Sequence, residues 1–60
     1  MSKQRDRTIT VSYWNQSAQE NACQFVQGVS WDFEDDWLTI TNARGDVVAQ
    51  FREDDVYTIV

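Results

Sequence analysis

Apolar and polar residues alternate strictly over residues 8–14, TITVSYW. In an extended strand, Ile9, Val11 and Tyr13 would point to one side and the residues between them to the other. Several of the seven residues are β-branched or aromatic, which favours strands. The pattern therefore predicts a β-strand with one face on a hydrophobic core.

A second alternating region, VSWDFEDDWLTIT, begins at Val29 and is divided by Asp35 and Asp36. Aspartate is one of the few residues other than glycine that tolerate the positive φ of a tight hairpin turn. A two-residue turn at this site creates two apolar cross-strand pairs, Phe33 with Leu38 and Trp31 with Ile40. The sequence therefore predicts a β-hairpin with an acidic tip.

The segment NARG, Asn42 to Gly45, predicts a four-residue loop with Gly45 in the left-handed conformation. With this loop Ile40 faces Val47, and Leu38 faces Ala49. The two turns together place eight apolar side chains on one face: Val29, Trp31, Phe33, Leu38, Ile40, Val47, Ala49 and Phe51. Because a one-residue slip would scatter this set, we predict a three-stranded meander over residues 29–51.

Residues 15–28 allow two interpretations. The segment SAQE at residues 17–20 is a capping box, and the apolar residues after it fall at helical spacing, which predicts a helix over about 18–27. The other interpretation is a polar turn followed by a strand through residues 23–26 that bends at Gly28. Such a short helix is marginal without packing, so we favour the strand or loop.

The final residues, VYTIV, predict a strand that follows a short turn at residues 52–55 and pairs with the first strand. The fold class is therefore all-β, as a small five-stranded antiparallel sheet or an SH3-like barrel around the meander. The spacing of strands and turns resembles that of SH3-like small barrels. The alternative is α+β with the helix at about 18–27. We expect a flexible basic arm over residues 1–7 and a single β domain over residues 8–60.

A chain of 60 residues has little capacity for a core, and a domain of this size buries only about 60% of its unfolded surface. Small domains commonly gain stability from disulfides, metals or self-association. Cys23 is the single cysteine and is expected to fill the core, and the chain has no histidine, which argues against a transition-metal site. We therefore expect a homo-oligomer without cofactors.

The N-terminal charges are followed by no apolar run, so we expect no signal peptide. No segment approaches the roughly 20 apolar residues that cross a bilayer, so we expect no membrane association. A single free cysteine suits a reducing compartment. These features predict a cytoplasmic protein, in the host cytoplasm if the source is a virus.

The net charge of -5 is unevenly distributed. Three of the five basic residues, Lys3, Arg5 and Arg7, lie in the first seven positions, and the rest of the chain is strongly acidic. An acidic body repels nucleic acid. Binding of nucleic acid or a small ligand by an oligomer, through these three residues and exposed aromatic side chains, is the alternative function.

Four acids, Asp32, Glu34, Asp35 and Asp36, surround the predicted hairpin turn. Their spacing lacks the pattern and the glycine of a calcium-binding EF-hand loop, so we predict no metal site. Acids at a hairpin tip form the turn and protect an aromatic hairpin from aggregation. They also create an acidic patch that can face a partner.

Three tryptophans are many for this length. In the predicted register Trp31 points into the core, whereas Trp37 points outward beside Gln50 and near Val48. Trp14 lies at the end of the first strand, on its polar side. Exposed aromatic residues are common anchors of protein interfaces, so the exposed tryptophans are candidate contacts for a partner.

No histidine and no nucleophile–base pair is present, and so short a sheet can hardly enclose a catalytic pocket. We therefore predict no enzyme and no catalytic residue. The predicted function is a small, acidic, self-associating protein-interaction module. Its size and charge fit a phage or mobile-element accessory protein that binds or inhibits a host factor. A resemblance points the same way, since hairpins of small phage and bacterial proteins are similar to the segment DDWLTITNARGDVVAQF. The candidate partner-binding residues are Trp37, Trp14, Val48, Asp32, Glu34, Asp35 and Asp36.

Overall fold

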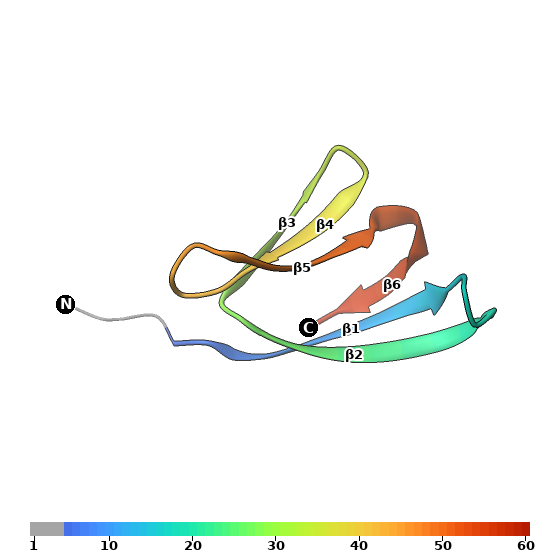
Figure 1. Cartoon of the computed structure of the whole chain (residues 1–60), viewed down its shortest axis with the longest axis horizontal. Coiled ribbons are helices and arrows are strands. Elements are labelled where there is room, and N and C mark those ends of the chain that lie inside the picture. Colours follow the sequence, from blue (N-terminus) through green and yellow to red (C-terminus); the bar gives the residue numbers. More distant parts are fainter. Residues whose placement is uncertain (1–4) are drawn as a thin grey trace.

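The computed structural model describes residues 5–60, which form two antiparallel sheets. The elements are β1 (Arg7–Asn15), β2 (Glu20–Gly28), β3 (Ser30–Glu34), β4 (Trp37–Thr41), β5 (Val47–Arg52), the 3₁₀ turn η1 (Glu53–Asp55) and β6 (Val56–Ile59). The first sheet has the order β2-β1-β6, and the second sheet has the order β3-β4-β5 (Figure 1). The predicted all-β class is confirmed, and so is the pairing of the last strand with the first.

The prediction of a single five-stranded sheet is wrong, because the chain bends at Val29 and divides one long extended segment into β2 and β3. Up to Gly28 this segment pairs with β1. At Val29 the backbone N–H donates instead to the carbonyl of Thr41, at 2.9 Å, and β3 then pairs with β4. The pairing gives two sheets of three strands and does not establish an SH3-like barrel specifically.

The alternative helix at about 18–27 is wrong. β2 pairs with β1 over nine consecutive residue pairs, from Arg7 with Gly28 to Asn15 with Glu20. The Asn15 side chain accepts a hydrogen bond from the Ala18 N–H at 3.2 Å, and Gln19 has a φ of 57°, so residues 16–19 form a turn. Regular pairing with β1 outweighs the weak preference of this segment for a short helix.

The acidic hairpin turn is as predicted. Asp35 and Asp36 have φ angles of 53° and 67°, which are typical of the primed turns that join two strands directly. The predicted cross-strand pairs form as well, Phe33 with Leu38 and Trp31 with Ile40.

The predicted register between β4 and β5 is wrong by two residues. Leu38 pairs with Phe51 and Ile40 with Ala49, and an irregularity between Ile40 and Thr41 leaves Val47 opposite Thr41. The connecting loop is longer than NARG, because the Asn42 N–H donates to the Asp46 carbonyl at 2.9 Å. As the shift is even, Ala49 and Phe51 keep their predicted face, but Val47 is 58% exposed rather than part of the core.

The side chain of Asn42 is expected to stabilise this loop. Its Oδ1 accepts hydrogen bonds from the backbone N–H groups of Arg44, at 2.9 Å, and Asp46, at 3.0 Å. Asn42→Ala should lower the free energy of unfolding by about 1 kcal/mol, because water replaces both bonds only in part. Urea titration measures this loss, and the exposed neighbour Ala43 provides a control as Ala43→Ser. Equal stability of the two variants would contradict this role.

Five apolar side chains form the buried core between the sheets. Ile9, Val11 and Val26 come from the first sheet, and Leu38 and Ile40 from the second. Trp31 is half-buried against this cluster. Cys23 is exposed on β2 rather than part of the core, because it lies opposite Ser12, on the face of β1 that points away from Ile9 and Val11.

Candidate functional site

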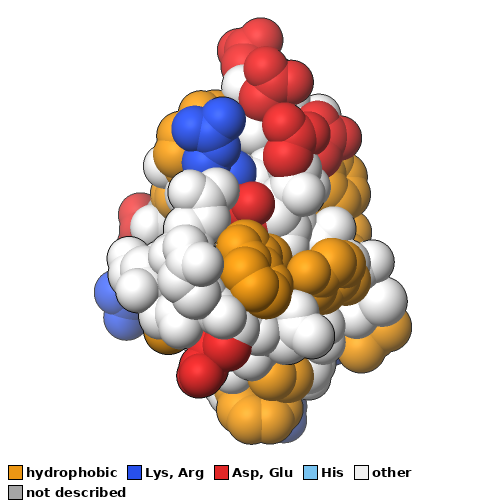
Figure 2. All heavy atoms as spheres, turned by 90° about the vertical axis from the view of Figure 1, so that its right-hand side faces the viewer, with side chains coloured by type: hydrophobic (Ala, Val, Ile, Leu, Met, Phe, Trp, Pro, Cys, Tyr) orange, Lys and Arg blue, Asp and Glu red, His pale blue; other side chains and the backbone are white. Residues whose placement is uncertain are grey.

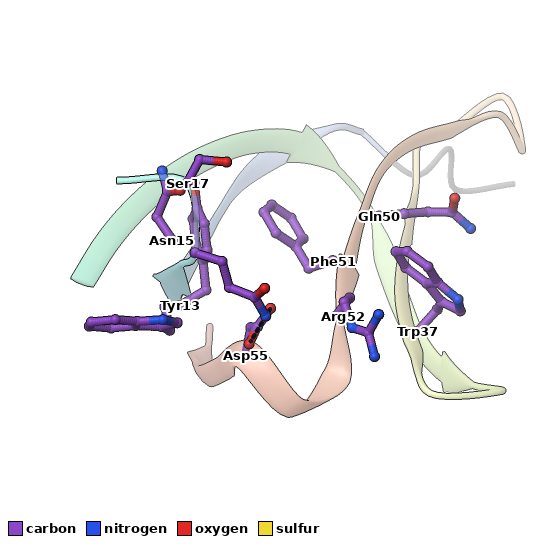
Figure 3. Close-up of a pocket in the computed structure, with 10 residues that line it drawn as sticks. Tyr13, Asn15, Ser17, Trp37, Gln50, Phe51, Arg52 and Asp55 are labelled. Carbon is purple, nitrogen blue, oxygen red and sulfur yellow. Dashed lines mark hydrogen bonds between the residues drawn. The ribbon is translucent and has the colours of Figure 1, made fainter. Parts of the chain in front are cut away.

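An open hollow of about 250 Å³ lies at one end of the molecule, where the end of β1 and the turn after it approach β5 and η1. We call it the aromatic hollow. Its lining residues are Tyr13, Trp14, Asn15, Gln16, Ser17, Trp37, Gln50, Phe51, Arg52 and Asp55 (Figure 3). It thus combines four aromatic side chains with a polar rim.

The floor of the aromatic hollow is a packed aromatic pair. The rings of Tyr13 and Phe51 have their centroids 5.0 Å apart at an interplanar angle of 50°. Such tilted pairs are favourable beyond the area that they bury. Both residues also pack against the core. The floor is therefore fixed by the two sheets and does not depend on a loop.

Hydrogen bonds fix the rim. Gln16 Nε2 donates to both carboxylate oxygens of Asp55, at 3.1 and 3.0 Å, and Figure 3 shows this contact beside the aromatic floor. The bonds join the turn after β1 to η1, which lies 39 residues further along the chain. Asn15 also contacts this turn, because its side chain accepts a hydrogen bond from the Ala18 N–H.

Trp37 and Trp14 both line the aromatic hollow. Trp37 is 43% exposed and points outward as expected, and Figure 3 shows it with Gln50 on the other side of the β5 ribbon from Phe51. Trp14 is half-buried at the end of β1. The two tryptophans come from different sheets, so the fold brings together two aromatic residues that the sequence identifies only separately.

Val48 does not lie beside Trp37. In the observed register the cross-strand partner of Trp37 is Arg52, four residues further along β5. Val48 is 42% exposed but lies outside the hollow. Val48 is therefore further from Trp37 than the predicted register places it, because that register was wrong by two residues.

The acids of the β3–β4 turn adjoin those of η1. The backbone N–H of Glu53 donates to the carbonyl of Asp36 at 2.9 Å, which brings two acidic segments to the same end of the molecule: Glu34, Asp35 and Asp36, and Glu53, Asp54 and Asp55. Figure 2 shows acidic side chains gathered at one end of a face that also exposes hydrophobic groups. Asp32 lies further along β3, opposite Thr39. Within residues 5–60, no group of three or more metal-ligating side chains is placed to hold an ion.

Two of the three basic residues of the N-terminal segment, Arg5 and Arg7, lie in the described part. Arg7 begins β1, and its guanidinium lies 5.3 Å from the centroid of the Trp31 ring, a cation–π contact. Arg5 is exposed. Asp6, between them, accepts a hydrogen bond from the Ala43 N–H at 2.8 Å. Lys3 lies outside the described residues.

Sequence reasoning missed several residues of the hollow. The alternation identified Tyr13 and Phe51 as core-facing, but nothing in the sequence indicated that they form the floor of a site. Gln16 and Asp55 carried no local signal, because each is a polar residue in a turn and they meet only in the folded chain.

Within residues 5–60, no helix is long and apolar enough to cross a membrane. No protein-family model matches the chain, and comparison with curated proteins and with solved structures finds no match either.

Proposed function

We propose that this chain is a small acidic protein-interaction module that binds a segment of another protein in its aromatic hollow. The observation that carries the proposal is that Trp14 and Trp37 line the same open hollow as the Tyr13–Phe51 pair. Tryptophan and tyrosine anchor many protein interfaces. The volume of about 250 Å³ is below the roughly 300–1,000 Å³ of small-molecule sites and fits side chains of a bound segment.

The charge of the rim favours a basic partner. Six carboxylates lie at this end of the molecule, in the β3–β4 turn and in η1, and Arg52 is the basic residue among the lining residues. Such a surface attracts lysine and arginine side chains and speeds their encounter. The bound segment is therefore one that combines an apolar residue with positive charge.

The chemistry of the hollow supports binding rather than catalysis. Asp55 is the one carboxylate that lines it, and both of its oxygens already accept hydrogen bonds from Gln16. Ser17 is the one serine in the lining, and it belongs to an exposed turn. An aromatic surface with an engaged carboxylate can orient a partner segment and does not by itself supply a nucleophile with a base.

Trp37→Ala is expected to weaken partner binding by at least about tenfold, because an exposed indole at the edge of a packed floor is typical of a binding hot spot. The probe is a set of peptides selected from a random displayed library against the wild-type protein. Affinities are measured by fluorescence anisotropy. Val48→Ala is the matched control, since Val48 is equally exposed but lies outside the hollow. Thermal unfolding of both variants should match that of the wild type.

The proposal fails if the library yields no binding peptide, or if Trp37→Ala and Val48→Ala bind alike. Selected peptides should be enriched in lysine and arginine.

A second version of the proposal is that the acidic residues imitate nucleic acid and bind in a basic groove of the partner. The residues that would do so are Asp32, Glu34, Asp35, Asp36, Asp54 and Asp55. A salt titration distinguishes this version from the first. That version requires affinity to fall steeply with ionic strength, and an affinity that is flat with salt removes it.

A further inference from the structure

The first sheet carries almost no charge. From Thr8 to Asn15, from Asn21 to Gly28 and from Val56 to Ile59, its three strands contain no Asp, Glu, Lys or Arg. All ten acids of the chain lie elsewhere: before β1, at strand ends, in loops and turns or on the second sheet. Because the chain carries a net charge of -5, two copies repel each other wherever their acids meet. Two copies of the chain can therefore approach each other through their first sheets with little repulsion between acidic side chains.

The edge strands differ in how they are protected. Natural proteins block free edges with charged residues, prolines, bulges or short strands. Among the strands of residues 5–60, β3 carries Asp32 and Glu34, β5 carries Arg52 and an irregular register, and β6 is four residues long with an irregular register. After Glu20, β2 has no charged residue, no proline and no bulge. It is nine residues long and pairs with β1 in regular register throughout. β2 is thus an open template for another strand (Figure 1).

The outer face of the first sheet exposes an aromatic side chain, Phe25, beside this edge, and an apolar one, Val60, on the other side of β1. Phe25 pairs with Thr10 across β1 and β2, and Thr10 exchanges two backbone hydrogen bonds with Val60, at 2.9 and 3.1 Å. Phe25 and Val60 are each 68% exposed. Phe25 is thus an exposed aromatic side chain on an uncharged edge strand, where a strand added to that edge would cover it.

We propose that two copies of this chain associate through their β2 strands, which pair antiparallel about a two-fold axis near Gln24. The pairing continues the first sheet from one copy into the other and places Phe25 at the centre of the contact. This interface is separate from the aromatic hollow, to which β2 contributes no residue, so either proposal can fail without the other.

The charges at the two ends of β2 favour a second copy over a foreign strand. A two-fold axis at Gln24 brings Glu20 of one copy opposite Gly28 of the other. Gly28 pairs within its own copy with Arg7, so Glu20 and Arg7 of different copies lie on the same face with one strand between them, at a backbone separation of about 10 Å. The pairing of β2 with itself therefore brings opposite charges near each other at both ends and places uncharged residues between them.

Sedimentation velocity from micromolar to near-millimolar concentrations tests the interface. The wild type should form a dimer, and Gln24→Lys should raise its dissociation constant at least about tenfold, because two like charges then meet at the two-fold axis. This variant lowers the net negative charge, so general repulsion cannot explain the loss. Val47→Lys adds the same charge to β5, another edge strand, and should dimerise like the wild type. Circular dichroism checks that both variants fold.

A second measurement locates the contact. Cys23 is exposed and is the one cysteine of the chain, and the proposed pairing brings the two copies of it to diagonal positions about 7–8 Å apart. A short bis-maleimide should therefore link wild-type dimers covalently but link few molecules of Gln24→Lys. A wild type that stays monomeric, a Gln24→Lys dimer of unchanged affinity, or a dimer that sediments but does not cross-link would each overturn the proposal.

Discussion

Replacing Ile40 with alanine is expected to lower the free energy of unfolding by about 2–5 kcal/mol. The Ile40 side chain is fully buried, and within residues 5–60 it belongs to a core of five buried apolar residues. It lies in the middle strand of the second sheet, between Trp31 on β3 and Ala49 on β5. A domain this small rarely has more than about 3–5 kcal/mol of stability, so the expected loss unfolds much of the population.

Urea unfolding, followed by tryptophan fluorescence, measures this loss. Ile40→Val should cost only about 0.5–1.5 kcal/mol, which keeps the test quantitative if the alanine variant does not fold. Val47→Ala is the control and should change stability by less than about 0.5 kcal/mol, since Val47 is 58% exposed. The register in which Ile40 faces Val47 makes both residues part of the core. Comparable losses at the two positions would therefore favour that register over the observed one.

The elements that could be predicted from the sequence are those with local signals. The alternation from Thr8 to Trp14 defines β1 because a strand with one buried face imposes a period of two. The Asp35–Asp36 turn could be predicted because its two-residue length and its residue types both select a primed turn. Once that turn is placed, the pairs between β3 and β4 follow without further information.

The parts that could not be predicted depend on contacts between distant residues. The β4–β5 register is set by Asn42, whose backbone and side chain close a loop extending to Asp46, and NARG alone does not show where that loop ends. The division of one extended segment into β2 and β3 depends on packing of the chain near Val29 against β4. Such tertiary contacts override local preference.

The same distinction applies to the aromatic hollow. The outward direction of Trp37 follows from strand alternation, and its exposure agrees. That Trp14 shares the hollow with it follows only from the way β6 and η1 return to β1, which brings Gln16 to Asp55. A site assembled from turns of two sheets has no contiguous motif.

Gly28→Ala is expected to destabilise the protein by about 1–3 kcal/mol through overpacking. A Cβ at this position would lie 2.9 Å from Ile40 Cγ2, 3.0 Å from the Thr41 carbonyl oxygen and 3.3 Å from Ile9 Cδ1. The carbonyl cannot easily move away, because it accepts the Val29 N–H hydrogen bond at the bend between the sheets. Relief of the clash must therefore separate the two sheets or disrupt the bend.

Gly45→Ala is the control for Gly28→Ala, because the two glycines are needed for different reasons. A Cβ at Gly45 meets no atom within 4 Å, but its φ of +89° is strained for alanine by about 1–2 kcal/mol. The strain at Gly45 lies in an exposed loop, so near-ultraviolet circular dichroism of the folded protein should stay unchanged in Gly45→Ala. In Gly28→Ala the same spectrum should change, since the clash disturbs the packing of Ile9 and Ile40 around half-buried Trp31. If Gly28→Ala is as stable as the wild type and keeps its spectrum, β2 and β4 do not approach as closely at this bend as the structure shows.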